Sequence, residues 1–215
     1  LAPRQVAIFP GPSMAAADFF DITIAGYGSH GAMPERSRDP VVIAMTLGQA
    51  LQTIVSRNVD PLQSAVLSIT QIHAGSAYNV IPGEAKLAGT VRTFSDKVRE
   101  RVRQRMRAIA AGMAAAFDVE IDVDIRDVFS VLSNHEEHAA AVAEAARGVV
   151  GEENVLTAPR PKMGSEDFAD MLLAAPGAYF WVGHEGSVPL HNPGFILDDA
   201  ILPLGASLFA RIVET

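Results

Sequence analysis

The chain has 215 residues, 49% of them hydrophobic and 20% charged, which is enough for one large domain or two small ones with a real core. Its net charge of −8 argues against nucleic acid or an anionic membrane as a partner, because both require a basic face, and the absence of cysteine excludes disulfides and thiolate metal ligands. No apolar run reaches the roughly 18 residues of a membrane span and no signal peptide is visible, so we expect a cytoplasmic protein.

The first 129 residues alternate between strand-like and helix-like patterns. In chain order, the residue periodicity predicts a strand, a helix, two strands, a helix and a strand over residues 18–29, 39–57, 64–75, 84–94, 95–113 and 118–129. Asp39-Pro40 is a good start for the first helix, and Ser95 is the candidate N-cap of the second. The order β-α-β-β-α-β is that of a ferredoxin-like unit, an antiparallel sheet with two helices on one face. The other face of the sheet and at least one edge strand then need cover or solvent, and a dimer partner would cover them.

The pattern changes after residue 129. An Ala-rich helix is predicted over 135–151, and a shorter helix with Ser165 as candidate N-cap over 164–177. A buried strand over 178–184 and a closing helix over 201–214 follow. This alternation indicates part of an α/β layered domain whose other strands lie elsewhere.

Four polar residues are candidates for a site. His30 lies in "GYGSHGAMP", where small neighbours leave the imidazole little to bury it. Asn79 precedes the rigid turn "IPG", and its carboxamide can either bind a substrate carbonyl or carboxylate or form an Asx turn. Arg92 lies inside a strand, and it is either directed to a sheet edge or aimed at an anion. His191 lies between two prolines, which stiffen a loop and hold a ligand still, but a structural role stays equally open.

Other charged groups have ordinary interpretations. His135 and His138 are three residues apart and could hold a metal, but a solvated first helical turn is the favoured interpretation. His73 and His184 have no evident partner in the sequence, and we predict structural roles for both. Arginines on the second helix are predicted to form a solvated face, at positions 99, 101, 103, 105 and 107. No phosphate loop, dinucleotide fingerprint or Ser-His-Asp signature is present.

Four motifs, in chain order, carry a family resemblance: "GYGSHGAMPERSRDPV", "QIHAGSAYNVIPGEAKLAGTVRTF", "MGSEDFADML" and "LHNPGFILDD". Together they resemble the dinuclear-metal amidohydrolases of the aminoacylase and carboxypeptidase clan, in the branch of hippurate hydrolase and N-acyl-amino-acid amidohydrolases. The resemblance implies an α/β catalytic domain with two Zn²⁺ or Mn²⁺ ions and an inserted ferredoxin-like lid that forms a homodimer. It assigns residues 1–16 to the end of the first catalytic segment, 17–128 to the lid, and 129–215 to the C-terminal half of the catalytic domain.

The same resemblance implies roles for the candidate residues. His30 matches the lid histidine that reaches into the neighbouring subunit's active site and stabilises the oxyanion of the tetrahedral intermediate. A donor at a developing oxyanion contributes about 3 kcal/mol. Asn79 and Arg92 match positions that hold the carbonyl and the carboxylate of the substrate. Gly164 and Ser165 match a loop that lines the substrate pocket.

His191 matches the last metal-binding histidine of the family. The branch's other ligands (a cysteine, histidines and a glutamate) and its glutamate general base all precede the lid, but the first 16 residues here include no His, Cys, Asp or Glu. Because a catalytic zinc site usually has three protein ligands, we expect this chain alone to bind no metal pair and to be inactive. The full-length parent is expected to hydrolyse the amide bond of a small N-acyl amino acid. The sequence "GFILDD" also replaces the more acidic and aromatic segment that the family often has after this histidine.

Two readings from other classes remain open. The chain could be a non-catalytic dimerisation module that kept the lid and lost the metal site. It could also be a small-ligand sensor of ferredoxin-like type, although such a protein has no reason to keep the "LHNPGF" loop. Metal ligands encoded upstream of Leu1 would distinguish the enzyme from both modules.

Overall fold

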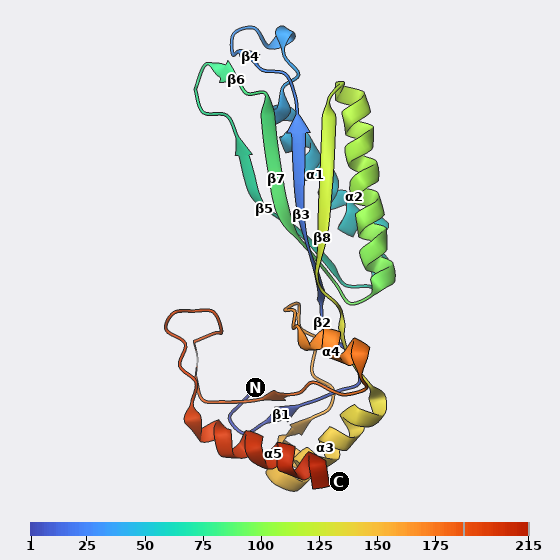
Figure 1. Cartoon of the computed structure of the whole chain (residues 1–215), viewed down its shortest axis with the longest axis vertical. Coiled ribbons are helices and arrows are strands. Elements are labelled where there is room, and N and C mark those ends of the chain that lie inside the picture. The colour runs from blue at the N-terminus through green and yellow to red at the C-terminus, as the bar shows by residue number, and fades with distance from the viewer. Residues whose placement is uncertain (187, 215) are drawn as a thin grey trace. The chain divides into compact units, whose positions relative to one another are not determined.

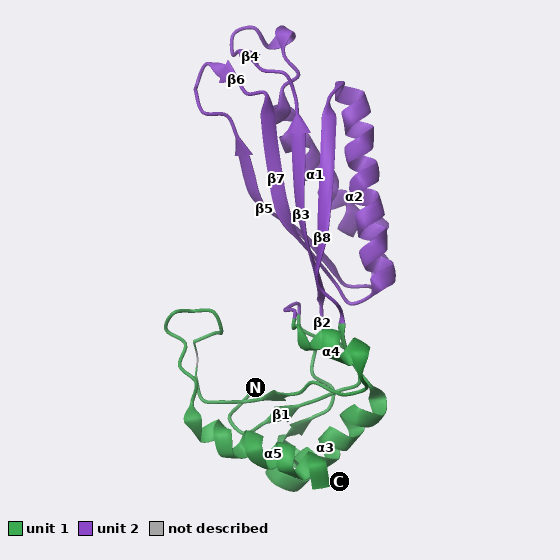
Figure 2. Ribbon diagram, viewed as in Figure 1, with its two compact units in different colours: residues 1–14, 132–162, 166–215 green, residues 15–131, 163–165 purple. Residues whose placement is uncertain are grey.

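The computed structural model describes residues 1–186 and 188–214, and the chain divides into two compact units (Figure 2). Unit 1 comprises residues 1–14, 132–162 and 166–215, and unit 2 comprises residues 15–131 and 163–165. Within the described part of the chain, none of the helices combines the length and the apolar character that a membrane crossing needs.

Unit 2 confirms the predicted β-α-β-β-α-β order. Its elements are β3 (Ala16–Ala25), α1 (Pro40–Asn58), β5 (Ala65–Ala74), β7 (Glu84–Thr93), α2 (Asp96–Phe117) and β8 (Glu120–Phe129). The four strands form one antiparallel sheet in the order β5-β7-β3-β8, and both helices cover the same face of it (Figure 1). The mixed α/β fold class is therefore as the sequence predicts.

The core of unit 2 lies between the sheet and the two helices. On β3 every second residue points to the helices, so that Phe20, Ile22 and Ile24 are fully buried. They pack against apolar residues that recur at helical spacing on α1 and α2: Ile43, Leu47, Leu51, Ile54, Val102 and Met106. The residues at period two on β3 and those at period 3.6 on the helices therefore form one core.

The helix starts differ in how they are capped. The Asp39 carboxylate accepts hydrogen bonds from the backbone N–H groups of Val41 and Val42, at 2.9 and 3.4 Å, and so caps α1. Ser95 occupies the N-cap position of α2 as predicted, but its side chain makes no capping hydrogen bond.

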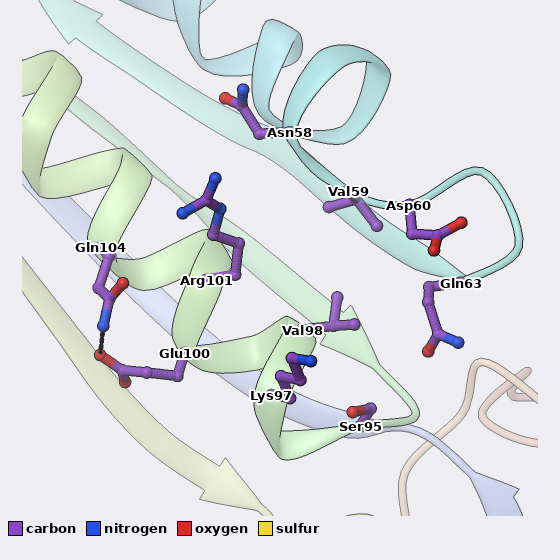
Figure 3. Close-up of a pocket in the computed structure, with 10 residues that line it drawn as sticks. All are labelled: Asn58, Val59, Asp60, Gln63, Ser95, Lys97, Val98, Glu100, Arg101 and Gln104. Atoms are coloured by element: carbon purple, nitrogen blue, oxygen red, sulfur yellow. Dashed lines mark hydrogen bonds between the residues drawn. The ribbon is translucent and has the colours of Figure 1, made fainter.

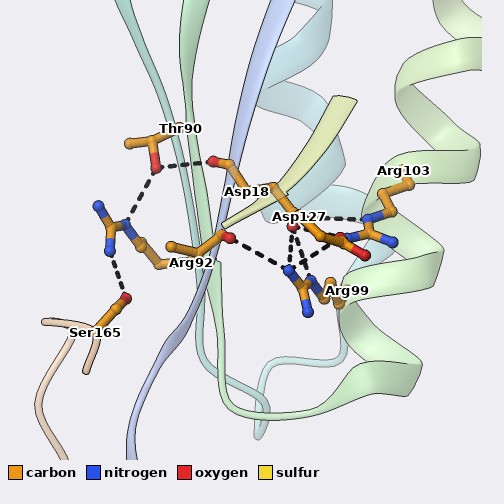
Figure 4. A network of polar contacts seen from close by, with 8 residues as sticks. Asp18, Thr90, Arg92, Arg99, Arg103, Asp127 and Ser165 are labelled. Atoms are coloured by element: carbon orange, nitrogen blue, oxygen red, sulfur yellow. Dashed lines mark hydrogen bonds and ion pairs between the residues drawn. The ribbon is translucent and has the colours of Figure 1, made fainter. Parts of the chain in front are cut away.

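The predicted solvated arginine face of α2 is wrong for two of its members. Asp18 lies on the helix-facing side of β3 with its side chain fully buried, and Arg99 and Arg103 bind it from α2 (Figure 4). The Nε atoms of the two arginines donate to Oδ1 and Oδ2 of Asp18, each at 2.9 Å. Asp127 on β8 pairs with both arginines as well. A buried carboxylate needs such partners, which explains why these arginines face inward.

Unit 1 holds two small sheets. Strands β10 (Val155–Leu156), β1 (Val6–Ala7) and β11 (Trp181–Val182) form one, with β1 parallel to β10 and antiparallel to β11. Strands β2 (Gly11–Met14) and β9 (Leu132–Asn134) form the other. The strand predicted over 178–184 is shorter than expected, because its partner β1 offers only two residues for pairing.

Three helices complete unit 1: α3 (Glu136–Val150), α4 (Phe168–Ala174) and α5 (Leu202–Glu214). The short 3₁₀ segments are η1 (Pro34–Arg36) in unit 2, and η2 (Glu152–Asn154) and η3 (Asp199–Ile201) in unit 1. The helix predicted over 164–177 begins only at Phe168, with Asp167 at the N-cap position, so Ser165 is not its cap. Ser165 instead accepts a hydrogen bond from Arg92.

Candidate functional site

His30 and Asn79 come together at one end of the unit 2 sheet. Strand β4 (Ser29–His30) pairs with β6 (Val80–Ile81), and His30 lies opposite Val80. The backbone N–H of Gly31 donates to the carbonyl oxygen of Asn79 at 2.8 Å. Figure 1 shows this two-stranded ribbon beyond the ends of β3 and β7, at the top of the view. Sequence periodicity could not predict the pairing, because two-residue strands are too short to carry a period.

Glycine permits the close approach of these two segments. A Cβ atom on Gly28 would lie 2.6 Å from the carbonyl oxygen of Ile81, and one on Gly31 would lie 3.3 Å from that of Asn79. The first distance is shorter than any normal contact, so only glycine fits there without a backbone shift. The small residues around His30 thus let its segment lie against the one that carries Asn79.

The His30 imidazole is exposed and has a defined tautomer. Its Nδ1 accepts a hydrogen bond from the backbone N–H of Ala32 at 3.1 Å. Because Nδ1 accepts, the proton of the neutral ring is on Nε2. His30 therefore presents an Nε2–H donor to whatever approaches this end of the sheet.

Arg92, Gly164 and Ser165 form a second group, also within unit 2. Arg92 Nη1 donates to Ser165 Oγ at 2.5 Å (Figure 4). The backbone N–H of Ala15 donates to the Gly164 carbonyl at 3.0 Å. Residues 163–165 are thereby attached to the strands of the sheet, although they follow β8 by more than 30 positions. Arg92 therefore contacts Ser165 directly, and Gly164 is bound next to it through the backbone.

The two groups lie at opposite ends of the same sheet. His30 and Asn79 lie beyond the end of the sheet where β7 begins, at Glu84. Arg92 lies eight residues further along β7, near its other end. At about 3.4 Å per residue this is a separation of roughly 27 Å. A single copy of unit 2 therefore does not bring His30 and Arg92 to one small ligand.

His191 belongs to unit 1 and is exposed in a loop, with φ at 69°. The following turn is fixed by Asn192, whose side chain and carbonyl accept from the N–H groups of Gly194 and Phe195, each at 2.9 Å. Over residues 1–186 and 188–214, no cluster of three or more His, Cys, Asp or Glu side chains could hold a metal ion. The described part of the chain therefore does not by itself form a metal site with three protein ligands.

Three further histidines have polar partners close to them. His135 Nδ1 lies 3.3 Å from the Gly177 carbonyl, and His184 Nδ1 lies 2.7 Å from the Glu185 carbonyl. His73 Nε2 lies 3.2 Å from Gln71 Oε1. These contacts agree with structural roles.

A surface hollow of about 660 Å³ lies elsewhere on unit 2, between the C-terminal end of α1 and the first turns of α2 (Figure 3). Its lining is mixed in charge and includes Asp60, Lys97, Glu100 and Arg101. None of the six candidate residues lines it, so its size alone does not identify a functional site.

Two titratable groups of unit 1, Glu166 and Tyr179, were not predicted from the sequence. The hydroxyl of Tyr179 donates to Glu166 Oε2 at 3.5 Å. Burial raises the pKa of Glu166 above its usual range, and a side-chain hydrogen bond with Asp167 adds to the effect. Burial, followed by the charge of Glu166, raises the pKa of Tyr179. The only sequence signal was the position of Glu166 directly after the "GS" of "MGSEDF".

The raised pKa of Glu166 predicts a pH-dependent loss of stability. Because the folded pKa lies above the unfolded one, the folded state holds the proton more tightly, and stability falls as the pH rises from the unfolded pKa, about 4.3, through the folded value. We therefore expect Glu166→Gln to gain thermal stability relative to the parent across this window and to keep the gain at higher pH. Melting temperatures of both proteins over a pH series would test this, and parallel curves would contradict it.

Comparison with known proteins places the chain in a family. Residues 6–215 match the peptidase family M20/M25/M40. The chain is 37% identical over 202 residues to hippurate hydrolase from Campylobacter jejuni, covering 94% of this chain and 53% of that protein. It is also 37% identical over 207 residues to N-acetylcysteine deacetylase from Bacillus subtilis, covering 96% of this chain and 54% of the relative.

A solved structure gives the same result. A dinuclear metal-binding peptidase of the M20 family from Bacillus subtilis superposes with a TM-score of 0.79 at 30% identity, covering 99% of this chain and 53% of the other. The chain thus spans about half the length of the relatives it matches. The order of its motifs, its fold and these matches agree, and the chain belongs to the peptidase family M20/M25/M40.

Proposed function

We propose that this chain supplies the lid and the second catalytic segment of a metal-dependent amidohydrolase that cleaves the amide bond of small N-acyl amino acids. Membership of the family supports the reaction type. The substrate class is supported by relatives named for hippurate and for N-acetylcysteine, both of which are N-acyl amino acids.

The observation that carries the proposal is the division of the candidate site between two ends of one sheet. His30 and Asn79 lie at one end and Arg92 with Ser165 at the other, roughly 27 Å apart along β7. An N-acyl amino acid is much shorter than this. A complete site therefore takes His30 and Asn79 from one copy and Arg92 from another, in a homodimer formed through unit 2.

Each residue has a role that matches its geometry. The exposed Nε2–H of His30 donates to the oxyanion that develops on the substrate carbonyl, and the Asn79 carboxamide binds the same carbonyl group. Arg92 binds the carboxylate of the amino-acid part, because a guanidinium fork matches a carboxylate. Gly164 and Ser165 line the pocket next to Arg92.

Among residues 1–186 and 188–214, no group of three or more His, Cys, Asp or Glu side chains is placed to hold a metal ion. In the proposed complete enzyme, His191 is one ligand of a pair of Zn²⁺ or Mn²⁺ ions, and the other ligands come from a segment outside this chain. This chain alone would then bind no metal pair and hydrolyse nothing.

A subunit-mixing experiment tests the proposal. His30→Ala and Arg92→Ala variants of the full-length protein are each expected to be nearly inactive as homodimers. After unfolding and refolding as an equal mixture, half of the dimers contain one copy of each variant, and one of their two sites is intact. We therefore expect the mixture to recover about a quarter of the wild-type turnover.

The control is an equal mixture of His30→Ala with a His30→Ala, Arg92→Ala double variant. It forms no intact site and should stay inactive. Failure of the first mixture to exceed this control, with mixed dimers demonstrated by mass spectrometry, would contradict a site shared between two copies. Inactivity of the wild-type full-length protein toward all N-acyl amino acids would favour a non-catalytic module.

A further inference from the structure

We infer that Thr90 is a positioning residue that orients the Arg92 guanidinium for a ligand carboxylate. The inference rests on the proposed function, because it gives Thr90 a role only through Arg92. Thr90 and Arg92 are two residues apart on β7, so both project from the sheet face opposite the helices. The side chains that flank them on β7, Val91 and Thr93, are buried on the other face.

The contacts of Thr90 form a short chain with a fixed direction. Its hydroxyl donates to the backbone carbonyl of Asp18 at 3.0 Å, and Arg92 Nε donates to the same hydroxyl at 3.1 Å (Figure 4). A hydroxyl has one hydrogen and two lone pairs. Because the hydrogen is used on Asp18, the oxygen turns a lone pair toward Arg92. The Thr90 oxygen is therefore a fixed acceptor, set by a main-chain atom of the neighbouring strand.

The hydrogen bonds of Arg92 show how the Thr90 acceptor orients the guanidinium. A guanidinium carries five N–H groups. One goes from Nε to Thr90 and one from Nη1 to Ser165 Oγ. Within residues 1–186 and 188–214, Nη2 has no hydrogen-bond partner. Two neutral hydroxyls therefore hold the guanidinium at two points and leave Nη2 available for an anion.

Neutral partners matter for the strength of anion binding. A carboxylate in place of Thr90 or Ser165 would neutralise the guanidinium and compete with the ligand, whereas a hydroxyl orients it and leaves its charge intact. Arginine otherwise has many rotamers, and fixing it before binding lowers the entropic cost of holding the ligand. Thr90 should thus influence ligands with a carboxylate and have little effect on ligands without one.

The test compares two ligands and three variants. Hippurate has a free carboxylate, and its primary amide, hippuramide, has the same shape without the charge. Dissociation constants for both are measured by calorimetry in a full-length His30→Ala background, which is expected to bind hippurate normally but hydrolyse it very slowly. The same background then carries Thr90→Val, Thr90→Ser or Arg92→Gln. Valine keeps the branched shape of threonine and removes the acceptor, whereas serine keeps the hydroxyl and removes only a methyl group.

We expect Thr90→Val to weaken hippurate binding about fivefold to tenfold and to leave hippuramide binding within about twofold. Thr90→Ser should stay within about twofold of the parent for both ligands. In steady-state kinetics Thr90→Val should raise KM for hippurate with little change in kcat, because the interaction is present in the ground state.

The outcomes distinguish the role of Thr90 from that of Arg92. Equal loss of both ligands in Thr90→Val, or no rescue by serine, would show a structural role and overturn the inference. If Arg92→Gln loses the preference for hippurate while Thr90→Val keeps it, Arg92 retains its proposed role and the inference on Thr90 alone fails. If Arg92→Gln keeps the preference, the proposed function of Arg92 fails.

Discussion

Replacement of His30 by alanine in the full-length protein should lower kcat about 10²–10³-fold and leave KM, the dimer and the metal content nearly unchanged. The size of the effect follows from the proposed role of His30 as a donor to a developing oxyanion, because such a donor acts in the transition state more than in the ground state. The selectivity follows from the surroundings of His30. Its ring is exposed, and among the described residues its one hydrogen bond comes from the backbone N–H of Ala32.

His73 offers a matched control for this experiment. It is another exposed histidine of unit 2, on β5, and its Nε2 lies 3.2 Å from Oε1 of Gln71 on the same strand. His73→Ala should keep kcat within about twofold of the parent, as expected for an exposed side chain outside a site. Turnover, elution volume and bound metal are measured for both variants. Unchanged turnover in His30→Ala would exclude the oxyanion role, and loss of the dimer would instead assign His30 to the interface.

Replacement of Asp18 by alanine should lower the free energy of unfolding by about 3–5 kcal/mol. The carboxylate is fully buried, and Arg99 and Arg103 bind it from α2. Without Asp18, Arg99 and Arg103 have no buried counter-charge within the described part of the chain. Asp127 still pairs with both, but its side chain is 69% exposed. The cost is thus dominated by arginines that lose their partner inside the unit.

Asp21 on the same strand provides the comparison. It pairs with Arg126, and both side chains are about half exposed, so Asp21→Ala should cost less than about 1 kcal/mol. Urea unfolding of this chain followed by far-ultraviolet circular dichroism measures both variants. A loss below about 1 kcal/mol for Asp18→Ala would show that the arginines reach solvent without it. Adding Arg99→Leu and Arg103→Met to Asp18→Leu should recover part of the stability, because all the buried charges are then removed.

Local patterns in the sequence were sufficient for the framework of unit 2. The period of two along β3 and the helical period of α1 place Phe20, Ile22, Leu47 and Leu51 in one core, and a buried face imposes this spacing on any sequence that fills it. The motifs around His30 and Asn79, and the one containing Gly164 and Ser165, were sufficient to name the family.

Contacts between distant segments could not be deduced in this way. The arginines of α2 look alike in the sequence, and only the helix position against β3 separates Arg99 and Arg103 from the solvated face. Asp18 carried a signal, since it shares the period of the buried Phe20 and Ile22. The order of the residues also gives no measure of the distance between Arg92 and His30.

The sequence by itself therefore determined the order of elements, the apolar faces and the residue types of the candidate site, because each of these depends on neighbours a few positions away. The tertiary structure alone decided that β4 pairs with β6 beside Asn79, that Ser165 meets Arg92, and that the two groups lie at opposite ends of the sheet. These features depend on strand register and on loop closure over as many as 73 positions. Such long-range contacts leave no periodic trace in the chain, because what fixes them is the packing of whole elements against one another.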